Sequence, residues 1–174
     1  MKQPTVWLYY ACLLGLFCLL KVAYIQASST DLYMLLAPTN YLVELTLGST
    51  SVFEPTVGFV HPSLHISIDK SCSGFNFWAM CWLMLSVAAV QQRLRLLLPV
   101  LLALPLVSYA LALLINTSRI LTAILLRRML PSTQHYEWLH QAEGAVLYLF
   151  SLVLIYLGFV AMCSYLHTRY APSA

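Results

Sequence analysis

Four apolar runs of membrane-spanning length divide the chain, at residues 6–26, 74–91, 96–115 and 145–166. A helix needs about 20 mainly apolar residues to cross the hydrocarbon core of a bilayer. The composition agrees, because 61% of the residues are hydrophobic and only 9% are charged, against roughly 25% charged in a soluble domain. We therefore predict an all-α polytopic membrane protein of about four transmembrane helices, forming a single domain over residues 1–174.

The first apolar run fits either a cleaved signal peptide or a retained anchor. Lys2 precedes the run, and Ala27 is a small residue of the kind at which signal peptides are cleaved. However, Lys21 interrupts the run, and Ile25 is a poor residue two positions before a cleavage site. These features favour a retained anchor.

Residues 27–73 change character and are too polar to cross the membrane. Residues 31–47 have an amphipathic pattern, but four of them make a poor span, namely Asp31, Pro38, Asn40 and Glu44. We expect a helix lying at the membrane interface. Short β patterns follow at residues 52–53, 59–60 and 64–69, separated by turn residues. They predict a small extracytoplasmic β-hairpin, with His61 and His65 on its surface.

The distribution of charge predicts the topology. With both termini and the loop at residues 91–95 inside, four basic residues face the cytoplasm and all six acids lie outside, as the positive-inside rule favours. Residues 27–73 and 116–144 are then extracytoplasmic. Three arginines oppose this arrangement, namely Arg119, Arg127 and Arg128. We interpret Arg127 and Arg128 as interface anchors and reserve a functional role for Arg119.

Three polar interruptions hold the reactive side chains, at residues 69–77, 116–119 and 140–144. Helical rise places Cys72, Arg119 and His140 at a similar depth near the outer face. Of the five cysteines only Cys72 has polar neighbours, and a thiol attacks a carbonyl as the thiolate, with help from a base or a positive charge. His140 is a candidate acid and base, and Arg119 a candidate for holding an oxyanion or a substrate carboxylate.

Four further residues are expected to support this site. Ser73 is placed to cap the helix that Cys72 opens, and Gly74 to leave room for a substrate backbone. Asn116 lies three residues before Arg119 on the same helix, and Glu143 precedes the last span; both are candidates for orienting Arg119 or His140. The tyrosines, eleven in all, suit membrane packing and interfacial belts. The cysteines form no CxxC pair or His-spaced cluster, so we expect no metal.

Structural interpretations of the same residues remain open. Cys72 is also compatible with a core or cap position, Arg119 with a membrane anchor, and His140 with a cap of the last helix. Two other classes of function fit the composition: a noncatalytic assembly subunit or small transporter, and a membrane thiol redox protein. The redox class is disfavoured because Cys72 and Cys81 would lie about 13 Å apart along a helix. The net charge of +3 is too small to indicate nucleic-acid binding.

Three motifs taken together resemble the signature of the exosortase and archaeosortase family. They are Cys72-Ser73-Gly74, then Asn116-Thr117-Ser118-Arg119-Ile120, then His140-Gln141-Ala142-Glu143-Gly144. Their order and spacing are similar to the family's cysteine, arginine and histidine pattern, and the short chain resembles the exosortase K type.

The resemblance implies a membrane-embedded cysteine protease or transpeptidase that needs no cofactor. Such enzymes cleave the C-terminal sorting signal of a translocated protein, which consists of a short motif, a transmembrane helix and a basic tail. A thioester acyl-enzyme then passes the protein to an acceptor. Carried over by position, Cys72 is the nucleophile, Arg119 the stabiliser and His140 the acid and base. The implied location is the bacterial cytoplasmic membrane, with the active site at the extracytoplasmic face.

Overall fold

The computed structural model describes residues 3–92, 97–129 and 136–169. In chain order the elements are α1 (Gln3–Gln26), α2 (Tyr33–Leu47), β1 (Val52–Glu54), β2 (Gly58–His61), β3 (Ile66–Ile68), a 3-10 turn η1 (Lys70–Cys72), α3 (Phe75–Gln91), α4 (Leu97–Met129) and α5 (Tyr136–Arg169). Within these described residues, four helical segments are long and apolar enough to cross a membrane, at Val6–Gln26, Lys70–Gln91, Leu97–Arg127 and Ala142–Leu166. The predicted polytopic, mainly helical fold is confirmed.

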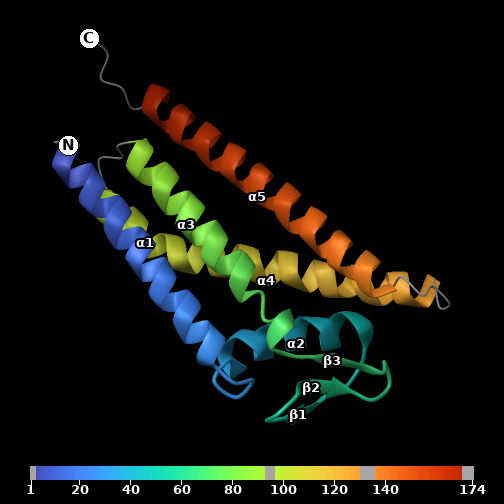
Figure 1. Cartoon of the computed structure of the whole chain (residues 1–174). Coiled ribbons are helices and arrows are strands. Elements are labelled where there is room, and N and C mark those ends of the chain that lie inside the picture. Colours follow the sequence, from blue (N-terminus) through green and yellow to red (C-terminus); the bar gives the residue numbers. More distant parts are fainter. Residues whose placement is uncertain (1–2, 93–96, 130–135, 170–174) are drawn as a thin grey trace.

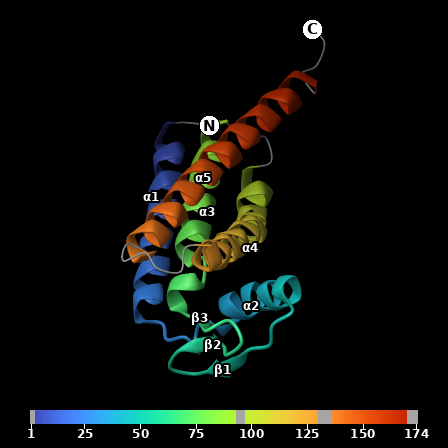
Figure 2. The same cartoon turned by 90° about the vertical axis from the view of Figure 1, so that its right-hand side faces the viewer.

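Helix α3 lies at the centre of the bundle, and α1, α4 and α5 all pack against it. Figures 1 and 2 show α1, α3 and α5 side by side, while α4 crosses them obliquely. In the most apolar stretch of the α3 span, 67% of the residues are buried, against 6–17% in the corresponding stretches of the other three spanning helices. Small residues such as Ala79 and Ala89 let α3 approach its neighbours closely. The exposed apolar faces of the outer helices are what lipid requires.

Two of the three polar interruptions do not break the helices. Residues 116–119 lie inside α4, and residues 140–144 lie inside α5. The backbone of a helix satisfies its own hydrogen bonds at membrane depth, so only the side chains need partners. Ser118, for example, donates from its hydroxyl to the Leu114 carbonyl oxygen at 2.9 Å. Polar residues therefore enter the bundle on continuous helices.

The predicted hairpin is part of a three-stranded antiparallel sheet in the order β1-β2-β3. It lies with α2 at the end of the bundle where α1 finishes and α3 begins (Figure 1). Apolar residues of α2, β2, β3 and α4 form one core there, including Leu36, Phe59, Ile68 and Ile124. Arg127 of α4 donates to the His65 carbonyl oxygen at 3.2 Å, so this arginine ties α4 to the turn before β3. The side chain of Arg128 lies outside the described residues.

The expectation that His61 lies on the surface is wrong, whereas His65 is exposed as expected. The His61 side chain is fully buried, and its Nε2 lies 2.8 Å from Asn40 Oδ1 of α2. Its Nδ1 lies 3.1 Å from the hydroxyl of Ser49. Burial lowers the pKa of His61, which favours the neutral ring. Both nitrogens have polar partners, so the ring is accommodated in the core under α2.

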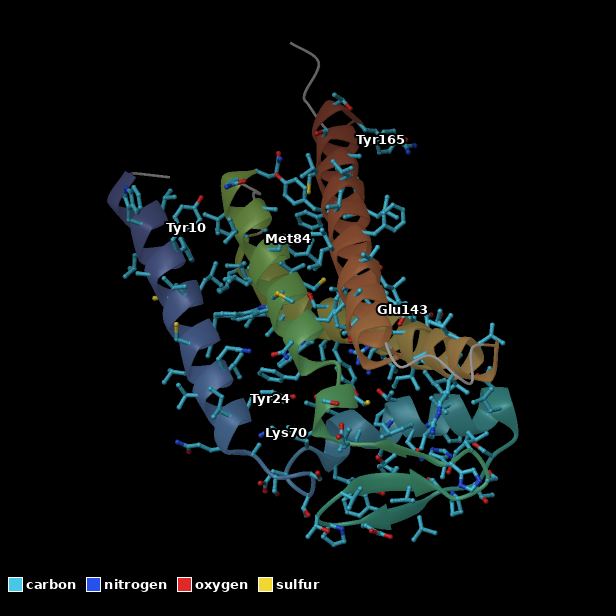
Figure 3. All side chains as sticks on the ribbon, turned by 45° about the vertical axis from the view of Figure 1, so that its right-hand side comes forward. Tyr10, Tyr24, Lys70, Met84, Glu143 and Tyr165 are labelled. Carbon is cyan, nitrogen blue, oxygen red and sulfur yellow. The ribbon has the colours of Figure 1, made fainter. Side chains whose placement is uncertain are left out.

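The end of α1 is fastened to the turn that carries Cys72. The Tyr24 hydroxyl donates to the Lys70 carbonyl oxygen at 2.9 Å, and its ring stacks on Phe75 at 4.3 Å. Lys70 donates from Nζ to the carbonyl oxygens of Ile25 and Ala27 at 3.0 and 2.7 Å. Figure 3 shows Tyr24 and Lys70 beside each other. These contacts fasten the end of α1 to the Cys72 turn, and the retention of α1 as an anchor stays a prediction.

Candidate active site

Cys72 ends a short, tightly hydrogen-bonded turn that follows directly from β3. Asp69 caps the turn, because its Oδ1 accepts hydrogen bonds from the backbone N–H and the hydroxyl of Ser71 at 2.8 and 2.6 Å. The Cys72 N–H in turn donates to the Asp69 carbonyl oxygen at 2.9 Å. The Ser71 hydroxyl lies 3.8 Å from the Cys72 sulfur. The thiol is half-buried against the core below α2.

Cys72 does not open α3, contrary to expectation. Gly74 lies between them with φ +69° and ψ 2°, a left-handed conformation that an α-helix does not accommodate. Helix α3 therefore starts at Phe75, whose N–H donates to the Ser73 hydroxyl oxygen at 3.4 Å. Gly74 is the N-cap residue of α3, so the prediction that Ser73 caps this helix is wrong; Ser73, one position earlier, accepts only from the first N–H of the helix. Ser73 and Gly74 separate Cys72 from the start of α3. The helix dipole therefore stabilises a Cys72 thiolate less than it would if Cys72 were in the first turn of the helix.

Asn116 of α4 contacts the Cys72 turn directly. Its side chain is buried, and Nδ2 donates to the Cys72 carbonyl oxygen at 2.6 Å. A Cβ atom at Gly74 would lie 3.0 Å from Asn116 Cγ. Gly74 thus lets the Asn116 side chain approach the Cys72 turn closely. The sequence had instead predicted that this glycine leaves room for a substrate backbone. Asn116 therefore fixes the peptide group that follows the thiol.

Arg119 is joined to the same turn through Tyr148 of α5. Its Nη1 donates to the Tyr148 hydroxyl at 2.9 Å, and its guanidinium carbon lies 5.2 Å from the centre of the Tyr148 ring. The Tyr148 hydroxyl donates to Asn116 Oδ1 at 2.6 Å. The Arg119 charge is also near enough to interact with Cys72 electrostatically. Arg119 and Cys72 are therefore parts of one connected site, built by the η1 turn, α4 and α5.

Helix α5 approaches Arg119 through a glycine. A Cβ atom at Gly144 would lie 3.2 Å from both Cδ and Nε of Arg119. Glu143 is half-buried with one carboxylate oxygen fully enclosed, and Figure 3 places it where α5 meets α4. His140 is one helical turn before Gly144 in α5, but its side chain lies outside the described residues. The position of the imidazole relative to Cys72 therefore stays a prediction.

Comparison with known protein families supplies an assignment for this arrangement. Residues 4–157 match the family model described as transmembrane exosortase (Exosortase_EpsH). The chain belongs to this family. The resemblance inferred from the three motifs is confirmed at family level. Comparison with curated proteins and with solved structures gives no match.

The exosortase site contains one residue that the sequence did not single out, Tyr148. A tyrosine in an apolar run is ordinarily a packing or interfacial residue, and ten others occur in the chain. The available signal was the spacing of His140, Gly144 and Tyr148, which recur every four residues and so share one face of a helix. Reading that face requires knowing that it meets Arg119, which only the packing of α5 on α4 provides.

The arrangement can supply a nucleophile and a positively charged group on one connected framework. One Arg119 nitrogen, Nη1, is held by Tyr148, which leaves the remaining N–H donors of the guanidinium for a ligand. Its Nε is buried and makes no hydrogen bond to the part of this exosortase that the structure describes. Over the same residues, His, Cys, Asp and Glu side chains form no group that could hold a metal ion. The framework thus suits stabilisation of negative charge near a thiol.

Proposed function

We propose that this exosortase is a membrane-embedded cysteine transpeptidase that cleaves the C-terminal sorting signal of a translocated protein. The observation that carries the proposal is the hydrogen-bonded connection from the Cys72 turn through Asn116 and Tyr148 to Arg119. A packing cysteine and a lipid-anchoring arginine would not need to be joined in this way. The predicted topology, with an excess of acids outside and bases inside, supports a site at the extracytoplasmic face of the cytoplasmic membrane.

The proposed reaction begins with transfer of the Cys72 proton to His140. The thiolate attacks the scissile carbonyl carbon, and the carbonyl π electrons move to oxygen, where Arg119 N–H donors stabilise the negative charge. The oxyanion then collapses, the carbon–nitrogen bond breaks, and His140 returns the proton to the leaving amine. The product is a thioester on Cys72. An acceptor nucleophile, or water, then attacks the thioester and releases the thiol.

The burial of the site explains why Arg119 is needed. A thiolate among apolar side chains is unfavourable without a nearby positive charge. Of the two charged groups that act on Cys72, the Asp69 carboxylate opposes the thiolate and Arg119 supports it to a lesser extent. The side chain of Asp69 already accepts two hydrogen bonds from Ser71. We therefore assign Asp69 to shaping the turn and Arg119 to stabilising charge.

The register of α5 supports His140 as the proton carrier. A Cβ atom at Gly144 would lie 3.2 Å from the Arg119 side chain, and His140 precedes Gly144 by four residues. Residues four apart in a helix share one face. This register supports the proposed role of His140, and replacing His140 with alanine serves as a second test of the mechanism.

The test is co-expression with a membrane-anchored protein that ends in a short motif, one hydrophobic helix and a basic tail. Wild type is expected to shorten this protein, and Cys72→Ala to leave it at full length. Cys12→Ala is the matched control, because Cys12 is an exposed free thiol on α1, and should process normally. If correctly folded Cys72→Ala protein shortened the substrate at the wild-type rate, the assignment would be wrong.

Gly144→Ala is expected to slow processing about tenfold, because the new methyl group displaces the Arg119 stem by a few tenths of an ångström. Gly158→Ala is the control on the same helix, since a Cβ there meets nothing within 4 Å. Both changes add helix propensity, so thermal stability in detergent should not fall for Gly158→Ala. Equal processing rates for the two variants would mean that Arg119 tolerates displacement.

A further inference from the structure

We propose that Tyr148 is a positioning residue of this site, which holds the Arg119 guanidinium and the Asn116 amide in fixed relation to the Cys72 turn. The claim that Tyr148 contributes to catalysis rests on the proposed function. The claim that Tyr148 positions Arg119 rests on the geometry alone. Tyr148 comes from α5, whereas both its hydrogen-bond partners come from α4.

Three hydrogen bonds in series connect Arg119, Tyr148, Asn116 and the Cys72 carbonyl oxygen. The groups at the two ends of this series determine the direction of each bond. At one end a guanidinium can only donate, and at the other the Cys72 carbonyl oxygen can only accept. The Tyr148 hydroxyl receives a hydrogen bond from Arg119 and gives its single proton to Asn116 Oδ1. Asn116 must then present Nδ2 to the Cys72 carbonyl oxygen, as observed. No other arrangement satisfies all four groups, so the chain holds one geometry.

This polarity also defines what Tyr148 does not do. Its only proton is committed to Asn116, so it cannot serve as an acid toward substrate without breaking the chain. Its role is therefore to orient the groups on either side. The Phe77 ring of α3 packs against the Tyr148 ring at 4.9 Å between centres, which holds the phenol in place.

The ring and the hydroxyl make separable contributions. The ring lies below the Arg119 guanidinium at 5.2 Å, a cation–π arrangement that phenylalanine would preserve. The hydroxyl makes both hydrogen bonds. Tyr148→Phe therefore removes the positioning and keeps the packing, whereas Tyr148→Leu removes both. We expect processing to slow about tenfold in Tyr148→Phe, with little change in the substrate concentration at half-maximal rate.

Two measurements test the proposal, and the second needs no substrate. The first is the processing rate on the co-expressed substrate. The second is the rate at which iodoacetamide alkylates Cys72 at fixed pH, resolved from other cysteines by mass spectrometry of the Cys72 peptide. The thiolate is the reacting form and Arg119 supports it. We expect Tyr148→Phe to slow alkylation several-fold. Tyr156→Phe, two turns later on α5, is the matched control and should behave as wild type.

A double-mutant cycle separates positioning from general loss of structure. If Tyr148 acts through Asn116 and Arg119, Asn116→Ala and Tyr148→Phe disrupt the same chain. Their combination should then be slowed less than the product of the single effects. Effects that multiply, or alkylation and processing at wild-type rates in Tyr148→Phe, would overturn the proposal. If wild type processes no substrate while Tyr148→Phe still slows alkylation, the transpeptidase assignment fails and the positioning role of Tyr148 stands.

Discussion

Arg119→Lys is expected to reduce thioester formation by roughly 10²- to 10³-fold, the loss typical of removing one main oxyanion-stabilising donor. Arginine donates to the Tyr148 hydroxyl with Nη1 while its guanidinium carbon lies 5.2 Å from the ring centre, and other N–H groups of the same plane remain for substrate. A lysine ammonium is a compact charge that cannot do both at fixed angles. The measurement is single-turnover processing of a reporter substrate by purified protein in detergent.

The chain supplies a close control for this substitution. At the other end of α5, Arg169 donates from Nη1 to the Tyr165 hydroxyl at 2.9 Å, and its guanidinium carbon lies 5.8 Å from that ring. This pair has nearly the same local geometry on an exposed surface, far along the helix from Gly144. Arg169→Lys should therefore leave processing unchanged. Wild-type activity in Arg119→Lys would show that only a positive charge is required there.

The spanning helices were predictable because their cause is local. Continuous apolar length decides whether a segment crosses a bilayer, and it can be counted along the sequence. The turn that Asp69 caps could also be predicted from the sequence, since an aspartate two residues before a serine is a common local capping arrangement. The order of Cys72, Arg119 and His140 pointed to the correct family. The spans and the turn are features that neighbours in sequence decide.

What escaped prediction depends on which segments pack together. His61 looked like a surface residue, yet α2 supplies Asn40 as a buried partner. Gly74 was assigned to substrate, although the closest neighbour of its missing side chain is Asn116. Tyr148 could not be told from ten other tyrosines until α5 was seen against α4. A polar residue in an apolar setting has a partner somewhere, but the sequence does not say on which helix.

The three helices of the site are joined by different kinds of contact. Between α3 and α4 the link is mainly close apolar packing, strengthened by Trp78, which donates from Nε1 to the Pro105 carbonyl oxygen at 2.9 Å. Between α4 and α5, near the thiol, it is the hydrogen-bonded pair of Arg119 and Tyr148. Directional bonds fix angles more strictly than apolar packing does. Small displacements of α5 should therefore change the orientation of the Arg119 guanidinium more than the partial burial of Arg119 alone would suggest.

Gly74→Ala is expected to reduce processing about 100-fold and to destabilise the protein by about 2–5 kcal/mol. The backbone strain of a left-handed alanine costs about 1–2 kcal/mol, and crowding against a packed side chain costs about 1–3 kcal/mol more. Asn116 cannot easily withdraw, because it is held at 2.6 Å by both the Cys72 carbonyl oxygen and the Tyr148 hydroxyl. Moving it misplaces the nucleophile and Arg119 together, and a shift near 1 Å can cost 10²-fold in rate.

Gly48→Ala separates the two costs. Gly48 has a similar left-handed conformation, φ +62° and ψ 28°, at the end of α2, and a Cβ there meets nothing within 4 Å. It should show the backbone cost alone, about 1–2 kcal/mol in thermal or denaturant unfolding in detergent, with normal processing. Gly74→Ala should exceed it in both measurements. If the two variants lost equal stability and processed equally well, Asn116 would not be pressed against the turn, and the connection from thiol to guanidinium would not control the rate.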